Sequence, residues 1–163
     1  MNSFKRLDIH LGGLEETHPL DLTEPKTVEA IILLIVSTGR LGEVKAEEIF
    51  LFEEDSDEEL PRDHILTHAH HGKRIHAHRC RHIKVTFIHV DEKREHSFRP
   101  AATIGKLLNW AKANFPVDKS AKYTLRMTAD GEPLPHAAHV GAYVKGHDCS
   151  LTLYFAPACR IQG

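Results

Sequence analysis

The sequence lacks three features that would place it in a familiar class: a long apolar run, an excess of basic charge, and a cysteine set that can pair completely. The longest apolar run, 30–36, has seven residues, whereas a membrane-spanning helix needs roughly 20, so we expect no transmembrane anchor. The first residues, Met1 to Arg6, lack the apolar centre of a signal peptide. Three cysteines cannot all pair within one chain. These absences fit a reducing cytoplasm best.

The charge balance excludes one further class of partner. The net charge is −2, so no sequence-wide basic field would attract nucleic acid. The halves differ, because residues 1–82 hold 10 Lys and Arg against 16 Asp and Glu (−6), and residues 83–163 hold 11 against 7 (+4). Much of the acidity lies at 53–59, which we interpret as a solvated loop. The asymmetry indicates two units.

Motifs for catalysis are also missing. No serine stands at nucleophile-elbow spacing with histidine and aspartate partners, and no phosphate-binding Gly-x-x-x-x-Gly-Lys loop exists. Trp110 is interpreted as packing in a core or domain interface, since aromatic side chains bury most of their area. We predict that the chain is not an enzyme.

The first half of the chain is typical of a strand-strand-helix-strand-strand unit. The expected strands are 4–11, a returning strand that includes 20–22, 49–52 and 74–79, with a tight turn at 12–13. The helix is the strongest local signal. Thr27 can cap its start and Gly39 can end it. One face of the helix collects five apolar residues: Val28, Ile31, Ile32, Ile35 and Val36.

The second half repeats this order of elements. Strands are expected at 83–90, 94–98, 123–128 and 149–155, with a short connecting segment at 140–144. Thr103 can cap the helix and Pro116 can stop it. The predicted buried face is Ile104, Leu107, Leu108, Ala111 and Phe115. The two capping threonines are 103 − 27 = 76 positions apart, so the repeat is about half the chain. No Gly, Ser or Pro linker separates the halves, which predicts a restricted orientation.

These residues resemble the ubiquitin family. The order of elements is similar to that of ubiquitin, and Glu24-Pro25-Lys26-Thr27-Val28-Glu29 is similar to the approach to the ubiquitin helix. The resemblance implies an α+β fold of two tandem β-grasp domains, at 1–80 and 81–156, followed by a flexible conjugation tail at 157–163. Such a tandem resembles the bacterial ubiquitin-like modifiers of Bil-type antiphage operons and the interferon-induced double-ubiquitin modifier of vertebrates.

The resemblance also implies a function for the tail. An E1-like activating enzyme would use ATP to activate the carboxylate of Gly163, and an E2-like conjugating enzyme would pass it to target lysines. Partners would include a deconjugating protease and target proteins such as phage structural proteins, but no nucleic acid and no membrane. Arg160, Ile161 and Gln162 would be recognised by the activating enzyme. The chain departs from ubiquitin in ending with one glycine rather than two.

Two features of the tail carry predictions of their own. Pro157 has no N–H to donate, so we expect it to keep the tail out of the sheet. Cys159 is interpreted as a small tail residue rather than a reactive thiol. A β-grasp sulfur carrier, holding sulfur as a C-terminal thiocarboxylate, is an alternative to the conjugated modifier.

The histidines leave a further alternative open. The chain has 14 histidines, and seven lie between His64 and His82. If 74–82 is extended, four zinc-type ligands project from one face: His76, His78, Cys80 and His82. A straight row at about 6.6 Å spacing cannot surround one ion, so further ligands would have to come from 64–71. We interpret the segment as hydrated, with no metal or cofactor, and keep a zinc-binding or adaptor module as the alternative.

Overall fold

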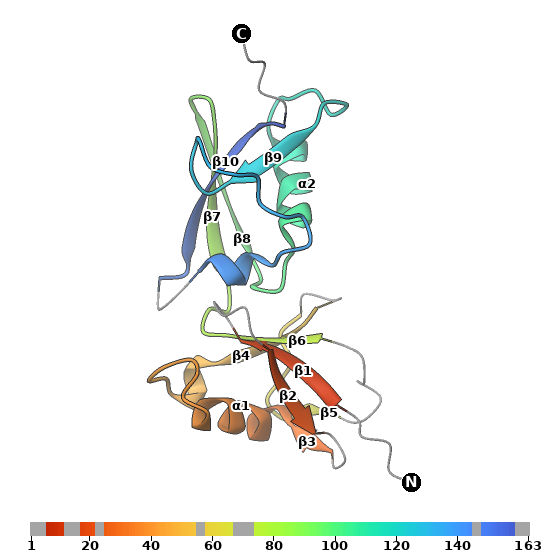
Figure 1. Ribbon diagram of the computed structural model, residues 1–163, viewed down its shortest axis with the longest axis vertical. Coiled ribbons are helices and arrows are strands. Elements are labelled where there is room, and N and C mark those ends of the chain that lie inside the picture. The colour runs from red at the N-terminus through yellow and green to blue at the C-terminus, as the bar shows by residue number, and fades with distance from the viewer. Residues whose placement is uncertain are drawn as a thin grey trace.

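Two mixed sheets, each packed against one α-helix, build the molecule (Figure 1). This computed structural model describes residues 6–11, 17–21, 25–54, 58–66, 74–144 and 148–158. The two sheet-and-helix units follow one another along the long axis (Figure 1).

The N-terminal sheet has the strand order β2-β1-β6-β4. Its strands are β1 (Arg6–Leu11), β2 (Thr17–Asp21), β4 (Phe50–Glu53) and β6 (Arg74–His78). Strand β1 is parallel to β6, while the β1–β2 and β4–β6 pairs are antiparallel. A separate short pair, β3 (Lys26–Thr27) with β5 (Ile65–Leu66), lies at the start of the helix. The sequence analysis did not predict this pair.

The C-terminal sheet repeats the same topology in the order β8-β7-β10-β9. Its strands are β7 (Ile83–His89), β8 (Glu92–Phe98), β9 (Tyr123–Arg126) and β10 (Ser150–Pro157). Strand β7 is parallel to β10, and the β7–β8 and β9–β10 pairs are antiparallel. The repetition of one mixed topology confirms an α+β fold of tandem β-grasp domains.

Both helices begin as the sequence predicts. The helix α1 (Val28–Ser37) is capped by Thr27, whose Oγ1 accepts a hydrogen bond from the N–H of Ala30 at 3.2 Å. The helix α2 (Ile104–Asn114) is capped by Thr103 in the same way, from the N–H of Lys106 at 3.2 Å. After α1, Gly39 adopts φ +70°, the left-handed conformation that glycine tolerates best.

Each helix covers one face of its sheet with the apolar residues expected. In α1 these are Val28, Ile31, Ile32 and Ile35, all buried, whereas Val36 is half-buried. In α2 and just after it they are Ile104, Leu107, Leu108, Ala111 and Phe115. Trp110 is partly buried on the C-terminal core and stacks on Phe87 with ring centroids 5.0 Å apart, so it packs inside its own domain. The two cores are separate clusters.

A disulfide fastens the junction of the domains. Strand β6 ends at His78 and β7 begins at Ile83. Between them, Cys80 is 1% exposed and bonded to Cys149, the residue that precedes β10. The sequence analysis did not predict this bond, which reducing compartments disfavour. Cys80 is therefore not an available thiol.

Neither of the two described α-helices is long and apolar enough to cross a membrane.

Candidate functional site

Strand β10 determines where the tail leaves the C-terminal domain. It pairs with β7 on one side and β9 on the other. Its inward side chains Leu151, Leu153 and Phe155 are buried, as their alternation in the sequence predicts. The strand begins near the N-terminal domain and runs to the far end of the molecule (Figure 1). Strand β10 thus ends at the end of the molecule opposite the domain junction (Figure 1).

The strand pairing continues to the edge of the predicted tail. Pro157 is the last residue of β10 and stands opposite Tyr123 in the register. The N–H of Ala158 donates to the carbonyl of Lys122 at 2.8 Å. The expectation that Pro157 excludes the tail from the sheet was therefore wrong, because the residue after a proline can still donate. The predicted recognition residues Arg160, Ile161 and Gln162 and the predicted conjugation residue Gly163, with Cys159, lie outside the described residues.

An aromatic cluster holds the end of β10. The ring of Phe155 stacks on Tyr123 with centroids 4.7 Å apart and lies 5.5 Å from Phe115. The Nδ1 of His89 is 2.9 Å from the Phe155 carbonyl oxygen, so this nitrogen carries the proton and donates. These contacts fix the backbone immediately before the tail.

A second group of residues joins the two domains. The N–H of Cys80 donates to Nδ1 of His78 at 2.9 Å, which leaves the proton on Nε2 to be donated to the Gly141 carbonyl at 3.0 Å. Burial lowers the pKa of His78, and its hydrogen bond to Gly141 acts in the opposite direction. His78 is thus a neutral structural residue that bridges β6 and the 3-10 turn η3 (Val140–Tyr143).

Beside His78 lies a cluster of four titratable side chains from both domains. Glu54 follows β4, His76 lies in β6, His10 lies opposite His76 in β1, and His139 precedes η3 of the C-terminal domain. The Glu54 carboxylate is 2.9 Å from Nε2 of His139 and 3.4 Å from Nε2 of His76. The ring of His10 stacks on His76, with centroids 4.9 Å apart and planes 16° apart.

The electrostatics of this cluster keep His76 uncharged. Its buried Nε2 has no hydrogen-bond partner within the described part of the chain. Burial is the main cause that lowers the pKa of His76 to about 3, and His139 and His10 lower it further. The pKa of His10 is also lowered, chiefly by burial and by the Arg74 guanidinium. His76 is therefore neutral at pH 7 in the folded protein.

The four candidate metal ligands predicted from the sequence have different surroundings in the structure. His76 belongs to the cluster, whereas His78 is occupied by Cys80 and Gly141, and Cys80 is bonded to Cys149. His82 is exposed, because the extended segment ends at His78 rather than continuing to it. Of the upstream histidines, His64 is exposed, and 67–73 lie outside the described residues. The predicted row does not exist; Glu54 and His139, which sequence reasoning missed, lie beside His76 instead.

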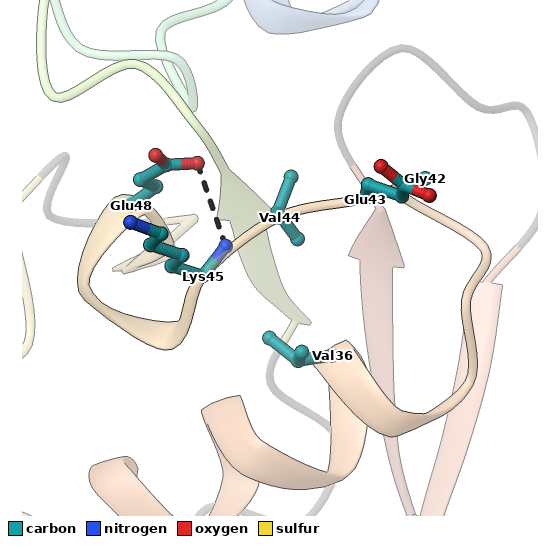
Figure 2. A pocket seen from close by; sticks show the side chains of 6 residues that line it. All are labelled: Val36, Gly42, Glu43, Val44, Lys45 and Glu48. Atoms are coloured by element: carbon teal, nitrogen blue, oxygen red, sulfur yellow. Dashed lines mark hydrogen bonds between the residues drawn. The ribbon is translucent and has the colours of Figure 1, made fainter.

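Two surface depressions accompany these features. One, beside the cluster, is lined by Glu54, Arg74, Ala101, Thr103, Lys106, Ala137 and His139. The other lies in the N-terminal domain between the end of α1 and the 3-10 turn η1 (Ala46–Glu48) (Figure 2). There the N–H of Lys45 donates to the Glu48 carboxylate at 3.4 Å, and Val36 and Val44 supply the apolar side (Figure 2). The second depression is lined by two carboxylates, Glu43 and Glu48, but by no histidine or cysteine. Of these two depressions, the first therefore has the nitrogen ligand that a transition metal prefers.

Comparison with known families identifies the C-terminal half. Residues 83–158 match the family described as BilA ubiquitin-like domain 2. Residues 83–158 are therefore similar to a BilA-type ubiquitin-like domain. Among solved structures, Caldiarchaeum subterraneum ubiquitin is similar over 50% of this chain and 99% of its own, at 16% identity and a TM-score of 0.38. No curated protein sequence matches the chain.

The matched range includes β10 and both strands that pair with it. It runs from the start of β7 to Ala158, the residue whose N–H closes the last described hydrogen bond to β9. It also includes His139 and Gly141, which face the N-terminal domain. The same ubiquitin-like domain thus supplies both the exit of the tail and half of the domain interface.

Proposed function

We propose that this chain is a ubiquitin-like modifier whose C-terminal carboxylate, at Gly163, is activated and joined to lysine side chains of other proteins. The observation that carries the proposal is the match of residues 83–158 to BilA ubiquitin-like domain 2. In this proposal the chain is the substrate of its enzymes and not itself a catalyst.

The geometry of the C-terminal domain supports a role for the tail. The last described residue, Ala158, is held by Lys122, and the Phe155 side chain before it is 2% exposed. The N-terminal domain is fastened at the other end, through Cys80 and His78. A tail that begins at a fixed point, at the end of β10 away from the N-terminal domain, is suited to enter a narrow enzyme channel.

The proposed chemistry requires of Gly163 only its carboxylate and a backbone that other groups can approach closely. The carboxylate of Gly163 would attack the α-phosphate of ATP, giving an acyl adenylate and pyrophosphate. A cysteine thiolate of the activating enzyme would then displace AMP, and after transfer to the conjugating enzyme a lysine amine would displace the thiol to form an amide. Glycine lets the backbone approach the phosphate and the thiol closely because it lacks a Cβ.

The partners follow from the same chemistry. We propose an E1-like activating enzyme that reads Arg160, Ile161 and Gln162, an E2-like conjugating enzyme, a deconjugating protease, and targets that include phage structural proteins in bacterial antiphage defence. Because activation consumes ATP, we place the reaction in the cytoplasm. There the Cys80–Cys149 bond must withstand reduction, which the burial of Cys80 favours.

The test is an activation assay with an E1-like activating enzyme of the proposed kind. The chain and a variant lacking Gly163 are incubated with enzyme and ATP, and products are resolved on non-reducing gels and by intact mass. Both carry Cys159→Ser, so that a mixed disulfide cannot be mistaken for a thioester. A thiol-sensitive adduct that requires ATP and Gly163 is expected. An adduct formed equally without Gly163, or none from an enzyme that hydrolyses ATP, would contradict the proposal. A thiocarboxylate at Gly163 would favour the sulfur carrier.

A further inference from the structure

We propose that Glu54, His76 and His139 form a binding site for a divalent transition metal, with zinc as the best fit, that bridges the two domains. The inference is independent of the modifier function. One ligand atom from each of the three side chains lies within 4.8 Å of the other two. Two ligands of a tetrahedral zinc ion, each about 2.0–2.1 Å from it, lie about 3.3 Å apart.

The distances around Glu54 are close to that ideal. Its Oε1 is 3.4 Å from Nε2 of His76 and 2.9 Å from Nε2 of His139. An ion between the three atoms would therefore need only small side-chain rotations. Glu54 and His76 share one sheet, since the β4–β6 register pairs Phe52 with His76 and the N–H of Glu54 donates to the Arg74 carbonyl at 3.1 Å. Two of the ligands are thus held on one rigid support.

The unpartnered nitrogen of His76 points to a missing ligand. Its side chain is only 8% exposed, yet its Nε2 makes no hydrogen bond within the described residues. A buried polar atom without a partner costs free energy comparable to a lost hydrogen bond. A metal ion between Glu54 and His139 would satisfy this nitrogen. The stacked ring of His10 restricts the rotation of the His76 ring.

The ligand set selects the kind of ion. Two imidazole nitrogens and one carboxylate suit zinc, and also cobalt, nickel and copper, whereas calcium and magnesium prefer oxygen ligands. The three protein groups leave a fourth tetrahedral position, and Glu54 and His139 both line the open depression beside the cluster. A water molecule entering from that depression would complete the coordination.

One neighbouring charge opposes the site. The Arg74 guanidinium is 3.9 Å from Oε1 of Glu54 and 58% exposed, so it competes with a cation for the carboxylate. Its exposure allows it to turn toward solvent when an ion binds. Replacing it with a neutral residue should therefore strengthen metal binding, a direction of change that a merely structural cluster would not produce.

The test is zinc titration of the chelator-treated protein by isothermal calorimetry, with bound metal counted by elemental analysis. One tight site per chain is expected in the wild type. Glu54→Gln and His139→Ala should each weaken that site at least 100-fold, and Arg74→Gln should tighten it several-fold. The matched control is His82→Ala, which removes an exposed histidine from the predicted row and should leave the affinity unchanged. Circular dichroism checks that each variant is folded.

A second readout distinguishes coordination from loose adsorption. Cobalt added in place of zinc should give the visible absorption of a tetrahedral nitrogen and oxygen site, and Glu54→Gln should abolish it. Wild-type protein that binds no zinc, or variants at Glu54 and His139 that bind it as tightly as wild type, would overturn the proposal. The two side chains come from different domains and are 24% and 15% exposed, so both substitutions are expected to preserve the fold.

Discussion

Cys80 and Cys149 are bonded through their sulfur atoms, which ties the junction between the domains to the residue that precedes β10. The bond closes a loop across a separation of 69 residues. Loops of this length restrict the unfolded chain enough to stabilise the folded state by roughly 4 kcal/mol in the chain-entropy view. We predict that Cys149→Ser lowers the free energy of unfolding by about 2–5 kcal/mol, measured by urea denaturation. Cys159→Ser is the control and should unfold like wild type. A Cys149→Ser variant with the same free energy of unfolding as wild type would contradict the prediction that this disulfide stabilises the fold.

Gly141 packs closely against the N-terminal domain, and its carbonyl accepts a hydrogen bond from Nε2 of His78. A Cβ at this position would lie 2.9 Å from Cδ2 of His78 and 2.9 Å from the carbonyl oxygen of Pro100. Because both neighbours are part of the packed interface, we predict that Gly141→Ala destabilises the protein by about 1–3 kcal/mol. Thermal unfolding would measure this. The control is Gly105→Ala in α2, where the nearest contact would be 3.4 Å and alanine should stabilise the helix by about 0.5–1 kcal/mol. Equal effects at both positions would refute the account of the interface.

Leu108 tests the buried face of α2. The residue is 6% exposed and belongs to the C-terminal core. Leu108→Ala should destabilise by about 2–5 kcal/mol through lost burial and the cavity left behind. Asn109→Ala, one residue further along on the exposed face, should change stability by no more than about 0.5 kcal/mol. Chemical denaturation of the pair compares the two faces. Little or no loss from Leu108→Ala would mean that the helix packs through another face.

The stability of the metal-free protein should fall in mild acid. Folding lowers the pKa of His76 from 6.5 to about 3, so below about pH 6.5 the unfolded state binds the proton first and stability is lost as the pH falls toward 3. Between pH 6.5 and 5 the loss reaches as much as about 2 kcal/mol for this one residue. The positive charges that His139, His10, Arg74 and His78 can carry add to the effect, because each of them lowers the pKa of His76.

Urea denaturation at several pH values, with chelator present, measures this slope. His76→Gln keeps a polar side chain without a titrating ring, so its stability should depend less steeply on pH than that of wild type. His78 retains a lowered pKa, and some slope should therefore remain in the variant. A slope identical in wild type and His76→Gln would show that His76 is not held uncharged in the fold.

Local signals predicted the elements of the fold well. Thr27 and Thr103 begin the helices as expected, and the apolar faces of both helices are buried. Such features depend on residues three or four positions apart, which a sequence displays directly. The β3–β5 pair was missed because each strand has only two residues, too few to show the alternation of a strand.

Features between the domains could not be predicted in the same way. The Cys80–Cys149 bond and the meeting of Glu54 and His76 with His139 depend on how the domains pack. The histidine-rich pattern drew attention to His76 but not to its neighbours in the structure, because Glu54 and His139 lie 22 and 63 positions away from it and leave no local spacing in the sequence. Glu54 itself lay inside an acidic run that was interpreted only as a solvated loop.

The most direct measurement of the central claim is peptide mapping of conjugates isolated from cells that express the chain together with the proposed activating and conjugating enzymes. Trypsin cuts after Arg160, so a lysine modified through Gly163 should retain the tripeptide Ile161-Gln162-Gly163 on its side-chain nitrogen. The account predicts such branched peptides on target proteins, and their loss when Gly163 is deleted. Conjugates joined through a residue other than Gly163 would contradict the account. So would the absence of branched peptides from cells in which the chain is abundant and its activating enzyme is functional.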